Sequence, residues 1–348
     1  MRKVAFILNP ISGRGRKKEI LGYIEVMLKK YPGWEGNFYT TKGVGDASSA
    51  ARKFAEEGYD VVVAIGGDGT VNEVAKGVVG TSCRLAIVPV GSGNGLARHL
   101  GIPMSYQEAV QTVFDGKPQL IDAGRINDEY FFCTAGVGFD AAVGKRFNSS
   151  TTRGLVSYME HCAKEYVKYE PEEYEIDILG TKFKQKAFLI TFANSSQWGN
   201  NVCIAPDANI SDGMMDVVIW RSSPMVTMPL ITAELFLKKI KYSEFVDTYR
   251  CKEVVIRRKG SGIIQFDGES MDIKYYSITA LNKGMINFKG VMLFSTNDHE
   301  IMQTVANRII DIDTGFDKYC TYDEYAGKRN GISSVGAFPP RCASDPRW

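Results

Sequence analysis

The sequence lacks the long apolar runs of a membrane or exported protein. Its longest apolar stretches, Val61 to Ile65 and Ala187 to Ala193, are far shorter than the roughly 20 residues that a spanning helix needs. Near the amino terminus, Asn9 and Pro10 interrupt the apolar run before a signal-peptide core is complete. We therefore expect a cytoplasmic protein that meets any lipid from outside the bilayer, by peripheral membrane association.

The sequence also lacks paired cysteines and an excess of one charge. Its 7 cysteines form no C-x-x-C pair and no metal-ligand spacing, and an odd number does not suit a disulfide framework. A reducing compartment fits this use of cysteine. The 42 basic and 40 acidic residues leave a formal net charge of +2, so no global field draws the chain onto nucleic acid. A nucleic-acid partner is not expected.

What the sequence does contain is enough apolar material, 44% of 348 residues, for two hydrophobic cores. Up to about residue 115, short β-branched runs alternate with helical patterns. Strands are expected at Val4–Leu8, Gly36–Thr41, Val61–Ile65 and Leu85–Val90, and helices at Lys17–Lys30, Ala47–Glu57, Asn72–Val79 and Gly95–Leu100. This order predicts a doubly wound α/β domain over residues 1–122, with a parallel sheet covered on both faces.

Strands predominate after residue 120. They are expected at Leu120–Ile126, Tyr130–Ala135, Tyr174–Leu179, Lys182–Ala193, Met215–Trp220, Glu253–Arg258 and Gly262–Phe266, with helices at Leu155–Tyr169 and Pro229–Ile240. This pattern predicts a second, mostly antiparallel β domain over residues 123–290, with a cleft between the two domains. A helical extension is expected over 291–326, with Val291–Phe294 as a candidate closing strand, and a disordered tail over 327–348.

Glycine-rich turns follow three of the predicted parallel strands. In the sharpest of them, Gly66-Gly67-Asp68-Gly69-Thr70, a buried strand ends at Gly66 and a helix is expected to open near Thr70. Glycines allow backbone amides to approach a phosphate, and a helix amino terminus supplies further N–H donors. Asp68 would repel bare phosphate, so its place in the turn indicates a magnesium ion between carboxylate and phosphate oxygens.

Two further turns are weaker signals on their own. Gly91-Ser92-Gly93-Asn94-Gly95 joins a strand to a helix, and Asn9-Pro10-Ile11-Ser12-Gly13 precedes a run of basic residues. No G-x-x-x-x-G-K-[ST] loop occurs, and Leu96 stands where a dinucleotide fingerprint has its third glycine. The turns therefore indicate phosphate binding of another kind.

Taken together, these motifs resemble the diacylglycerol kinase and sphingosine kinase catalytic family, and its bacterial branch in particular. The resemblance runs from residue 1 to about 290. Its later pieces are Gly136-x-Gly138-Phe139-Asp140-Ala141, Gln197-Trp198-Gly199-Asn200-Asn201, Ala205-Pro206-Asp207-Ala208 with Asp212-Gly213, and Asp267-Gly268-Glu269. Residues 291–326 separately resemble the carboxyl-terminal end of an ATP-binding-cassette translation factor, to which we assign no activity.

The resemblance implies an ATP-dependent lipid kinase. Its amino-terminal domain would be like those of phosphofructokinases and NAD kinases, and its carboxyl-terminal β-sandwich would receive the lipid. It implies a magnesium site formed by Asn209, Asp212 and the carbonyl of Met214. The implied nucleotide contacts are Asn9, Pro10, Ile11, Ser12, Gly13, Thr41, Gly66, Gly67, Asp68, Gly69, Thr70, Val71, Asn72, Glu73, Ser92, Gly93 and Asn94.

A lipid hydroxyl must lose its proton as it attacks the γ-phosphorus, so one carboxylate is expected to act as a base. The resemblance to bacterial members favours Glu269, followed by Asp267, whereas the sphingosine kinase branch favours Asp68. Asp267-Gly268 is also a common hairpin turn. Asp140 is expected either to bind the lipid headgroup or to cap the helix that follows it.

The expected partner is a lipid substrate at the membrane surface, and the sequence leaves a homodimer open. The apolar segment Val226–Tyr242, with its lysines, would either pack in the core or lie on an anionic membrane. Two other functions share some of these features. An NAD kinase has the same Gly-Gly-Asp-Gly-Thr turn, and a non-catalytic lipid-binding protein could keep the fold.

Overall fold

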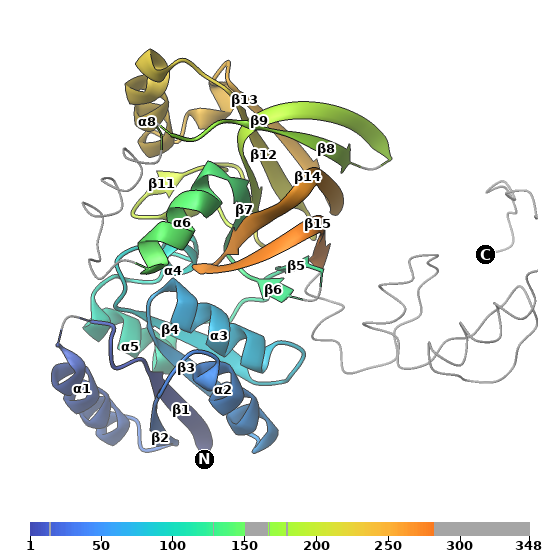
Figure 1. The fold of residues 1–348 in the computed structure, drawn as a ribbon. Helices are drawn as coiled ribbons and strands as arrows, with labels where there is room; N and C mark the ends of the chain where they lie inside the picture. The colour runs from blue at the N-terminus through green and yellow to red at the C-terminus, as the bar shows by residue number, and fades with distance from the viewer. Residues whose placement is uncertain (14, 128, 150–165, 167, 179, 282–348) are drawn as a thin grey trace, which may run out of the picture. The chain divides into compact units, whose positions relative to one another are not determined.

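The computed structural model describes residues 1–281 except 14, 128, 150–165, 167 and 179 (Figure 1). These residues belong to one compact unit, Met1–Asn287. The expected closing strand, helical extension and tail, and the resemblance to a translation factor, lie outside the described residues. Most of the helix expected at Leu155–Tyr169 also lies outside them.

Four parallel strands form the sheet of the first domain. In the order β2-β1-β3-β4, they are β2 (Trp34–Thr40), β1 (Arg2–Leu8), β3 (Val61–Gly66) and β4 (Arg84–Pro89). Alternate residues of β1 face opposite sides, because side chains along a strand have a period of two. Phe6 packs on the face covered by α1 (Lys17–Lys30) and α5 (Tyr106–Asp115), and Ile7 on the face covered by α2 (Asp46–Glu56) and α3 (Asp68–Val78). The expected doubly wound arrangement is confirmed.

Two helices of this domain differ from expectation. Helix α3 begins at Asp68 rather than near Thr70, so the aspartate lies in the first helical turn, where a negative charge is favoured by the helix dipole. Helix α5 was not expected, although Ala109, Val110, Val113 and Phe114 form its buried face. A short helix, α4 (Gly95–His99), follows the glycine turn after β4 as expected.

The second domain is built on a larger antiparallel sheet. Its order is β13-β12-β9-β7-β14-β15-β5-β6, with β8 pairing both β14 and β9, and a separate pair is formed by β10 and β11. The bounds are β5 (Ala123–Ile126), β6 (Glu129–Phe131), β7 (Thr134–Gly138), β8 (Glu172–Ile178), β9 (Thr181–Ala193), β10 (Gln197–Gly199), β11 (Val202–Cys203), β12 (Met215–Arg221), β13 (Val246–Cys251), β14 (Glu253–Phe266) and β15 (Glu269–Leu281).

The long strands β9 and β14 give this domain its sandwich form. The first half of each pairs with β8 and the second half with β7, so the sheet folds around an interior that contains Tyr174, Phe192 and Phe266. Its outer face is covered by α6 (Phe139–Ser149) and α8 (Met228–Phe236), as Figure 1 shows. The expected antiparallel β-sandwich is confirmed.

Several strands of this domain have other bounds than expected. Glu253–Arg258 and Gly262–Phe266 belong to one strand, β14, with a register shift between Arg257 and Gly262. The run Tyr130–Ala135 is instead divided into β6 and β7 at Phe132 and Cys133. Strand β5 begins only at Ala123.

The two domains meet where the glycine turns lie. Helix α3 contacts β6, and α4 contacts β10, so the carboxyl ends of the parallel strands face the second domain. This is the edge at which open α/β sheets bind ligands. Across the described residues, each helix is too short or too polar to traverse a bilayer.

Candidate active site

In chain order, the first glycine turn is Asn9–Gly13, the second is Gly66–Thr70 and the third is Gly91–Gly95. The second and third turns touch each other through their backbones. A Cβ added to Gly91 would lie 2.4 Å from the Cα of Gly67, and the Val90 N–H donates to the carbonyl of Gly66 at 3.0 Å. A Cβ atom never approaches a backbone carbon so closely, so only glycine allows this packing. Glycine is therefore needed at position 91 to let the two turns pack against each other, and not only to form its own turn.

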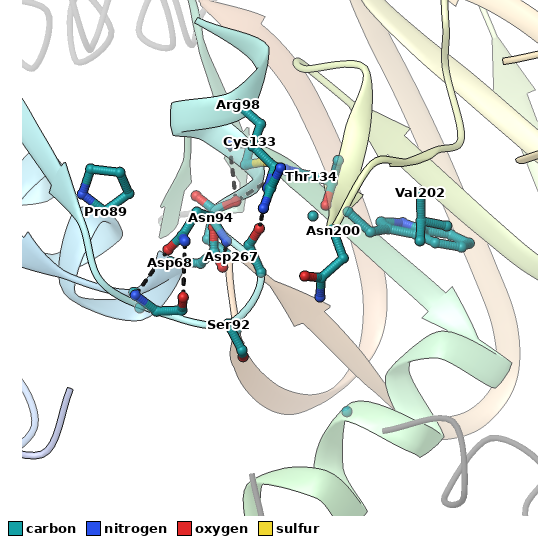
Figure 2. Close-up of a pocket in the computed structure, with 18 of the residues that line it drawn as sticks. Asp68, Pro89, Ser92, Asn94, Arg98, Cys133, Thr134, Asn200, Val202 and Asp267 are labelled. Carbon is teal, nitrogen blue, oxygen red and sulfur yellow. Dashed lines mark hydrogen bonds between the residues drawn. The ribbon is translucent and has the colours of Figure 1, made fainter. Parts of the chain in front are cut away.

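Asp68 holds the third glycine turn in place. Its carboxylate accepts hydrogen bonds from the backbone N–H groups of Asn94, at 2.8 Å, and Gly95, at 2.7 Å (Figure 2). Asn94 closes the turn itself, since its side chain accepts from the Gly91 N–H and donates to the Gly91 carbonyl. An ionised carboxylate can accept about four hydrogen bonds, so Asp68 keeps capacity for a ligand.

The first glycine turn is tied to the second through Asn9. The Asn9 side chain donates to the hydroxyl of Thr70 at 3.1 Å and accepts from the Ile11 N–H at 3.0 Å. Gly13 has a φ of 85°, in the left-handed region that glycine adopts without cost. Three turns from three strands are thus held together at one edge of the sheet.

Asp267 is the most fully hydrogen-bonded carboxylate of the site. It accepts from the backbone N–H groups of Phe132, Cys133 and Thr134 at 2.6 to 3.0 Å, and from the side-chain amide of Asn72 at 3.0 Å. These four bonds join the turn after β14 to the break between β6 and β7 and to α3. They fill the acceptor capacity of the carboxylate.

The Asp267-Gly268 pair also makes a two-residue hairpin. Phe266 pairs with Glu269, and both turn residues have positive φ, 46° and 90°, as type I′ turns require. The hairpin explains why these residue types occur together, and the four hydrogen bonds give the aspartate a second role within it.

Burial raises the pKa of both aspartates. Loss of solvent raises the pKa of Asp68, against the lowering effect of the Gly95 and Asn94 N–H bonds. Loss of solvent also raises the pKa of Asp267, to about 7, against three backbone N–H bonds, and the negative charge of Asp68 adds to the rise. The two carboxylates therefore lie close enough to interact, as Figure 2 shows. Pairs with shifted pKa values are typical of catalytic sites.

Glu269 points to a different place. Its carboxylate lies 3.1 Å from the ammonium of Lys76, which also contacts Glu129 at 3.0 Å. The side chain of Glu269 is 32% exposed and does not line the cavity described below. Lys76 belongs to α3. This ion pair is therefore a second link between α3 and the β domain, after the hydrogen bond from Asn72 to Asp267.

The glycine turns open into a cavity of about 1750 Å³. One part of it is lined by the turns with Asp68 and Asp267, and the other by apolar side chains of the β domain. The apolar lining consists of Phe139, Phe188, Leu189, Val202, Trp220, Met225, Met228, Pro229, Leu235 and Phe236. A pocket for one drug-sized ligand has about 300–1,000 Å³, so this cavity has room for two ligands of different polarity.

Asp140 stands in the apolar part. It is 4% exposed, and Oδ1 accepts from the Ala141 N–H at 2.8 Å in the first turn of α6, whereas Oδ2 has no partner among the described atoms. Burial raises the pKa of Asp140 to about 7. A Cβ on Gly136 would lie 2.0 Å from Oδ2, so the glycine leaves space for this carboxyl group. Both expected roles, helix capping and headgroup binding, are compatible with this geometry.

Comparison with known proteins identifies the family. Residues 3–126 match the diacylglycerol kinase catalytic domain, and residues 133–278 match the YegS C-terminal NAD kinase beta sandwich-like domain. A diacylglycerol kinase of Bacillus subtilis (strain 168) is 34% identical over 232 residues, which cover 64% of this chain and 75% of the relative. The chain belongs to the diacylglycerol kinase family. It is a lipid kinase, which phosphorylates an alcohol acceptor.

Two further comparisons agree with this assignment. A diacylglycerol kinase of Staphylococcus aureus (strain bovine RF122 / ET3-1) is 30% identical over 234 residues, which cover 66% of this chain and 74% of the relative. A crystal structure of a diacylglycerol kinase from Bacillus anthracis str. Sterne superposes with a TM-score of 0.65 at 22% identity, over 83% of this chain and 97% of that one. This likeness supports the fold.

The nucleotide contacts expected for the kinase divide into two groups. Those that line the cavity are Asn9, Ile11, Ser12, Gly13, Gly67, Asp68, Gly69, Thr70, Ser92, Gly93 and Asn94. Those that do not are Pro10, Thr41, Gly66, Val71, Asn72 and Glu73. Glu73 accepts from the Ala47 N–H at 3.1 Å and so connects α3 to the start of α2. All of these assignments remain predictions of nucleotide binding.

Two of the three expected magnesium ligands of the β domain already have other partners. Asn209 accepts from the Ser211 N–H, and Asp212 accepts from the Met214 N–H and pairs with Arg250. Among the described residues, no group of three or more His, Cys, Asp or Glu side chains is placed to share a metal ion. A metal at this place would have to displace Arg250, and the site stays a prediction.

Residues of the cavity that were not expected as site residues come from the joint between the domains. Arg98 donates to the Gly93 carbonyl at 3.1 Å and to Asn201 at 3.2 Å, and the Asn200 N–H donates to the same Gly93 carbonyl (Figure 2). Cys133 and Thr134, whose N–H groups bind Asp267, also line the cavity. Asn200 lies in a motif that carries the family resemblance, and Arg98 follows shortly after the Gly91–Gly95 turn, so the sequence signal for both residues is their position.

Proposed function

We propose that the enzyme transfers the γ-phosphoryl group of Mg-ATP to the free hydroxyl of diacylglycerol. The observation that carries this proposal is the single cavity that joins three glycine turns to an apolar chamber. Such a cavity brings a polyanionic donor and an apolar acceptor to one place. The relatives, which are named diacylglycerol kinase, support the choice of acceptor.

The donor would bind on the three glycine turns. Backbone N–H groups at the start of α3, with the side chains of Ser12 and Ser92 nearby, would donate to the phosphate oxygens, because a helix amino terminus attracts anions. Arg98, at the Gly93 carbonyl, would add positive charge beside the phosphates.

Asp68 is the carboxylate that fits a magnesium ion best. It lines the cavity and retains acceptor capacity, and Mg²⁺ is commonly held by one or two carboxylates with substrate phosphates and water. When bound, the ion would supply positive charge to the phosphate oxygens. The oxygens of Asn209 and Asp212 are already hydrogen-bonded or ion-paired, so they fit an ion less well, and we assign them no step.

The acceptor hydroxyl would be held between Asp140 and the glycine turns. Its oxygen forms a bond to the γ-phosphorus, the bond from that phosphorus to the bridging oxygen breaks, and the hydroxyl proton passes to a carboxylate. Asp68 faces the cavity, and its carboxylate oxygen that is not on the ion would accept the proton, whereas the four bonds of Asp267 make it a positioning residue. Glu269 would have to leave Lys76 to act as the base.

The test is the transfer of labelled phosphate from ATP, with and without magnesium, to a panel of acceptors in mixed micelles. The panel contains diacylglycerol, a sphingoid base and NAD. We expect labelled diacylglycerol, only with magnesium, and a loss of at least about a hundredfold in Asp68→Asn. Labelled NADP would instead indicate an NAD kinase, and lipid binding without any product would indicate a non-catalytic protein.

The same assay compares two of the candidate bases, Glu269 and Asp68. We expect Glu269→Gln to retain more activity than Asp68→Asn, because of these two carboxylates only Asp68 lines the cavity. A larger loss in Glu269→Gln than in Asp68→Asn would return the role of the base to Glu269.

A further inference from the structure

The segment Met225–Tyr242 exposes an unusual amount of apolar side chain. It comprises the 3-10 turn η1 (Met225–Thr227), α8 and the 3-10 turn η2 (Ile240–Tyr242). We call its exposed side chains the α8 face. They are Met225 (64% exposed), Val226 (85%), Leu230 (61%), Phe236 (45%), Leu237 (64%) and Tyr242 (75%). A helix that is apolar on all sides is typical of a buried or lipid-facing position.

The opposite side of the same segment is fixed in the core. Ile231, Leu235 and Ile240 are buried with Phe188 and Trp220 under the outer face of the second sheet. The apolar residues of α8 beyond this core contact are therefore not needed to hold the helix in place. Of the two placements expected from the sequence, packing in the core applies to this side of the helix, and contact with an anionic membrane stays a prediction for the other side.

The α8 face adjoins the mouth of the cavity. Met225 and Phe236 are exposed and also line the cavity, and Met228 and Pro229 line it beside them. An apolar molecule could thus move from an apolar medium on this face into the chamber that contains Asp140 without crossing a polar rim at α8.

Positive charge borders the face. Lys238, Lys239 and Lys241 follow the end of α8 and are exposed, and Lys241 is paired with Asp207. Glu234 is the only acidic residue between Met225 and Tyr242, which leaves the segment with a net charge of +2 from three lysines and one glutamate. Apolar side chains bordered by lysines are typical of surfaces that lie on anionic lipid bilayers.

We propose that the α8 face, with Lys238 and Lys239, is the surface on which the enzyme rests on an anionic bilayer while the lipid enters the cavity. This inference rests on the proposed function, because the acceptor of a lipid kinase resides in a bilayer. The exposed apolar side chains would enter the interface, and the lysines would remain at the headgroups.

The test measures binding of the full chain to vesicles without nucleotide. The vesicles are phosphatidylcholine alone, or phosphatidylcholine with about 30% phosphatidylglycerol, an amount that makes the surface clearly anionic. Two variants change the α8 face or its lysines at positions that do not line the cavity. The apolar variant is Val226→Ser/Leu230→Ser/Leu237→Ser. The lysine variant is Lys238→Gln/Lys239→Gln. The matched control is Val26→Ser/Lys29→Gln/Lys30→Gln on α1, which changes the same residue types at exposed positions in the other domain.

We expect the apolar variant to bind both kinds of vesicle at least about tenfold more weakly. The lysine variant should lose about tenfold on anionic vesicles only, together with most of the salt dependence of binding. The α1 control should bind as the unaltered enzyme does. Equal binding by all four proteins would overturn the proposal.

Two further measurements distinguish bilayer docking from a direct effect on catalysis and from dimerisation. Activity on a dispersed short-chain diacylglycerol, without vesicles, should be unchanged in both α8 variants. If the unaltered enzyme fails in that assay but binds vesicles through the α8 face, the proposed function is wrong and the docking surface stands. Light scattering that shows a dimer, lost in the apolar variant while vesicle binding persists, would make the face a contact between two copies and overturn the docking surface.

Discussion

Asp267 has a hydrogen-bonding role that an ordinary turn aspartate does not have. We expect Asp267→Asn to lower the free energy of unfolding by about 3 kcal/mol, because one amide oxygen replaces two carboxylate oxygens and buried N–H donors lose their acceptor. Urea denaturation followed by circular dichroism measures this change. The matched control is Glu269→Gln, whose partly exposed ion pair contributes about 1 kcal/mol or less. Equal losses in the two variants would contradict the anchoring role.

Asp216 makes the stability of the fold depend on pH in a way that can be tested. Burial, with a contribution from the negative charge of Asp207, raises the pKa of Asp216 to about 6. Because the pKa in the folded state lies above the unfolded value, the proton stabilises the fold below about pH 4. This stabilisation is lost as the pH rises through about 6.

We therefore expect Asp216→Asn to be more stable than the unaltered enzyme at about pH 8, by about 1–3 kcal/mol, and to show almost no gain near pH 4. Urea denaturation at the two pH values measures the difference between the proteins. Other carboxyl groups with raised pKa values occur in both proteins, so their effects cancel. A gain that is the same at both pH values would show that the charge of Asp216 is not its cause.

At the scale of elements, the contact between two glycine turns should be as necessary as either turn. In Gly91→Ala the new methyl group would meet the backbone of Gly67, so the turns after β3 and β4 must separate. We expect ATP affinity, measured by titration calorimetry, to fall at least about tenfold as the amide lining is disrupted. The control Gly22→Ala, on α1 with open space around its Cβ, should leave affinity unchanged. Unchanged affinity in Gly91→Ala would mean that the turns can separate without loss.

The elements themselves could largely be predicted from local patterns. The parallel strands and α1 follow β-branched runs and helical periodicity, so their positions agree with expectation within a few residues. Helix α5 was missed because the last helix expected in this domain ended at Leu100, although the buried residues after Ser105 repeat with helical spacing. Local periodicity also could not reveal the break between β6 and β7. There, the Phe132 N–H binds Asp267, 135 residues away along the chain, instead of a neighbouring strand.

The candidate site was predicted in part for the same reason. Motifs show which turns carry glycine and carboxylate, so Asp68 and Ser92 could be expected at a phosphate-binding site, and both line the cavity. They do not show which partners a side chain finds across the domain joint. The expected base Glu269 lies 193 residues from Lys76 in sequence, and the expected metal ligand Asp212 is paired with Arg250. Such pairings depend on tertiary packing, which no local pattern specifies.

At the scale of the whole molecule, α3 connects the proposed donor side of the site to the proposed acceptor side. Its first residue is Asp68, and its last turn contains Lys76, which contacts Glu129 of β6 and Glu269 of β15. Asn72, between them, donates to Asp267. The helix thus carries the Asp68 turn at one end and two links to the β domain along its length, so under the proposed function its position would set the distance between the two substrates.

We therefore expect Lys76→Met to slow phosphoryl transfer about tenfold at saturating ATP and lipid while leaving ATP affinity unchanged. The methionine keeps a side chain of similar length but removes the charge that lies over the Phe266 ring and holds Glu129 and Glu269, so α3 loses its fixed position on the β domain. Parallel measurements of kcat and of ATP binding test this split. The control is Lys53→Met on α2, where a 76% exposed lysine lies 3.8 Å from Glu57 within its own helix, and its removal should change neither quantity. The opposite result, weaker ATP binding with an unchanged kcat, would mean that Lys76 acts only within the first domain. The alignment of donor and acceptor would then have to depend on other contacts between the two domains.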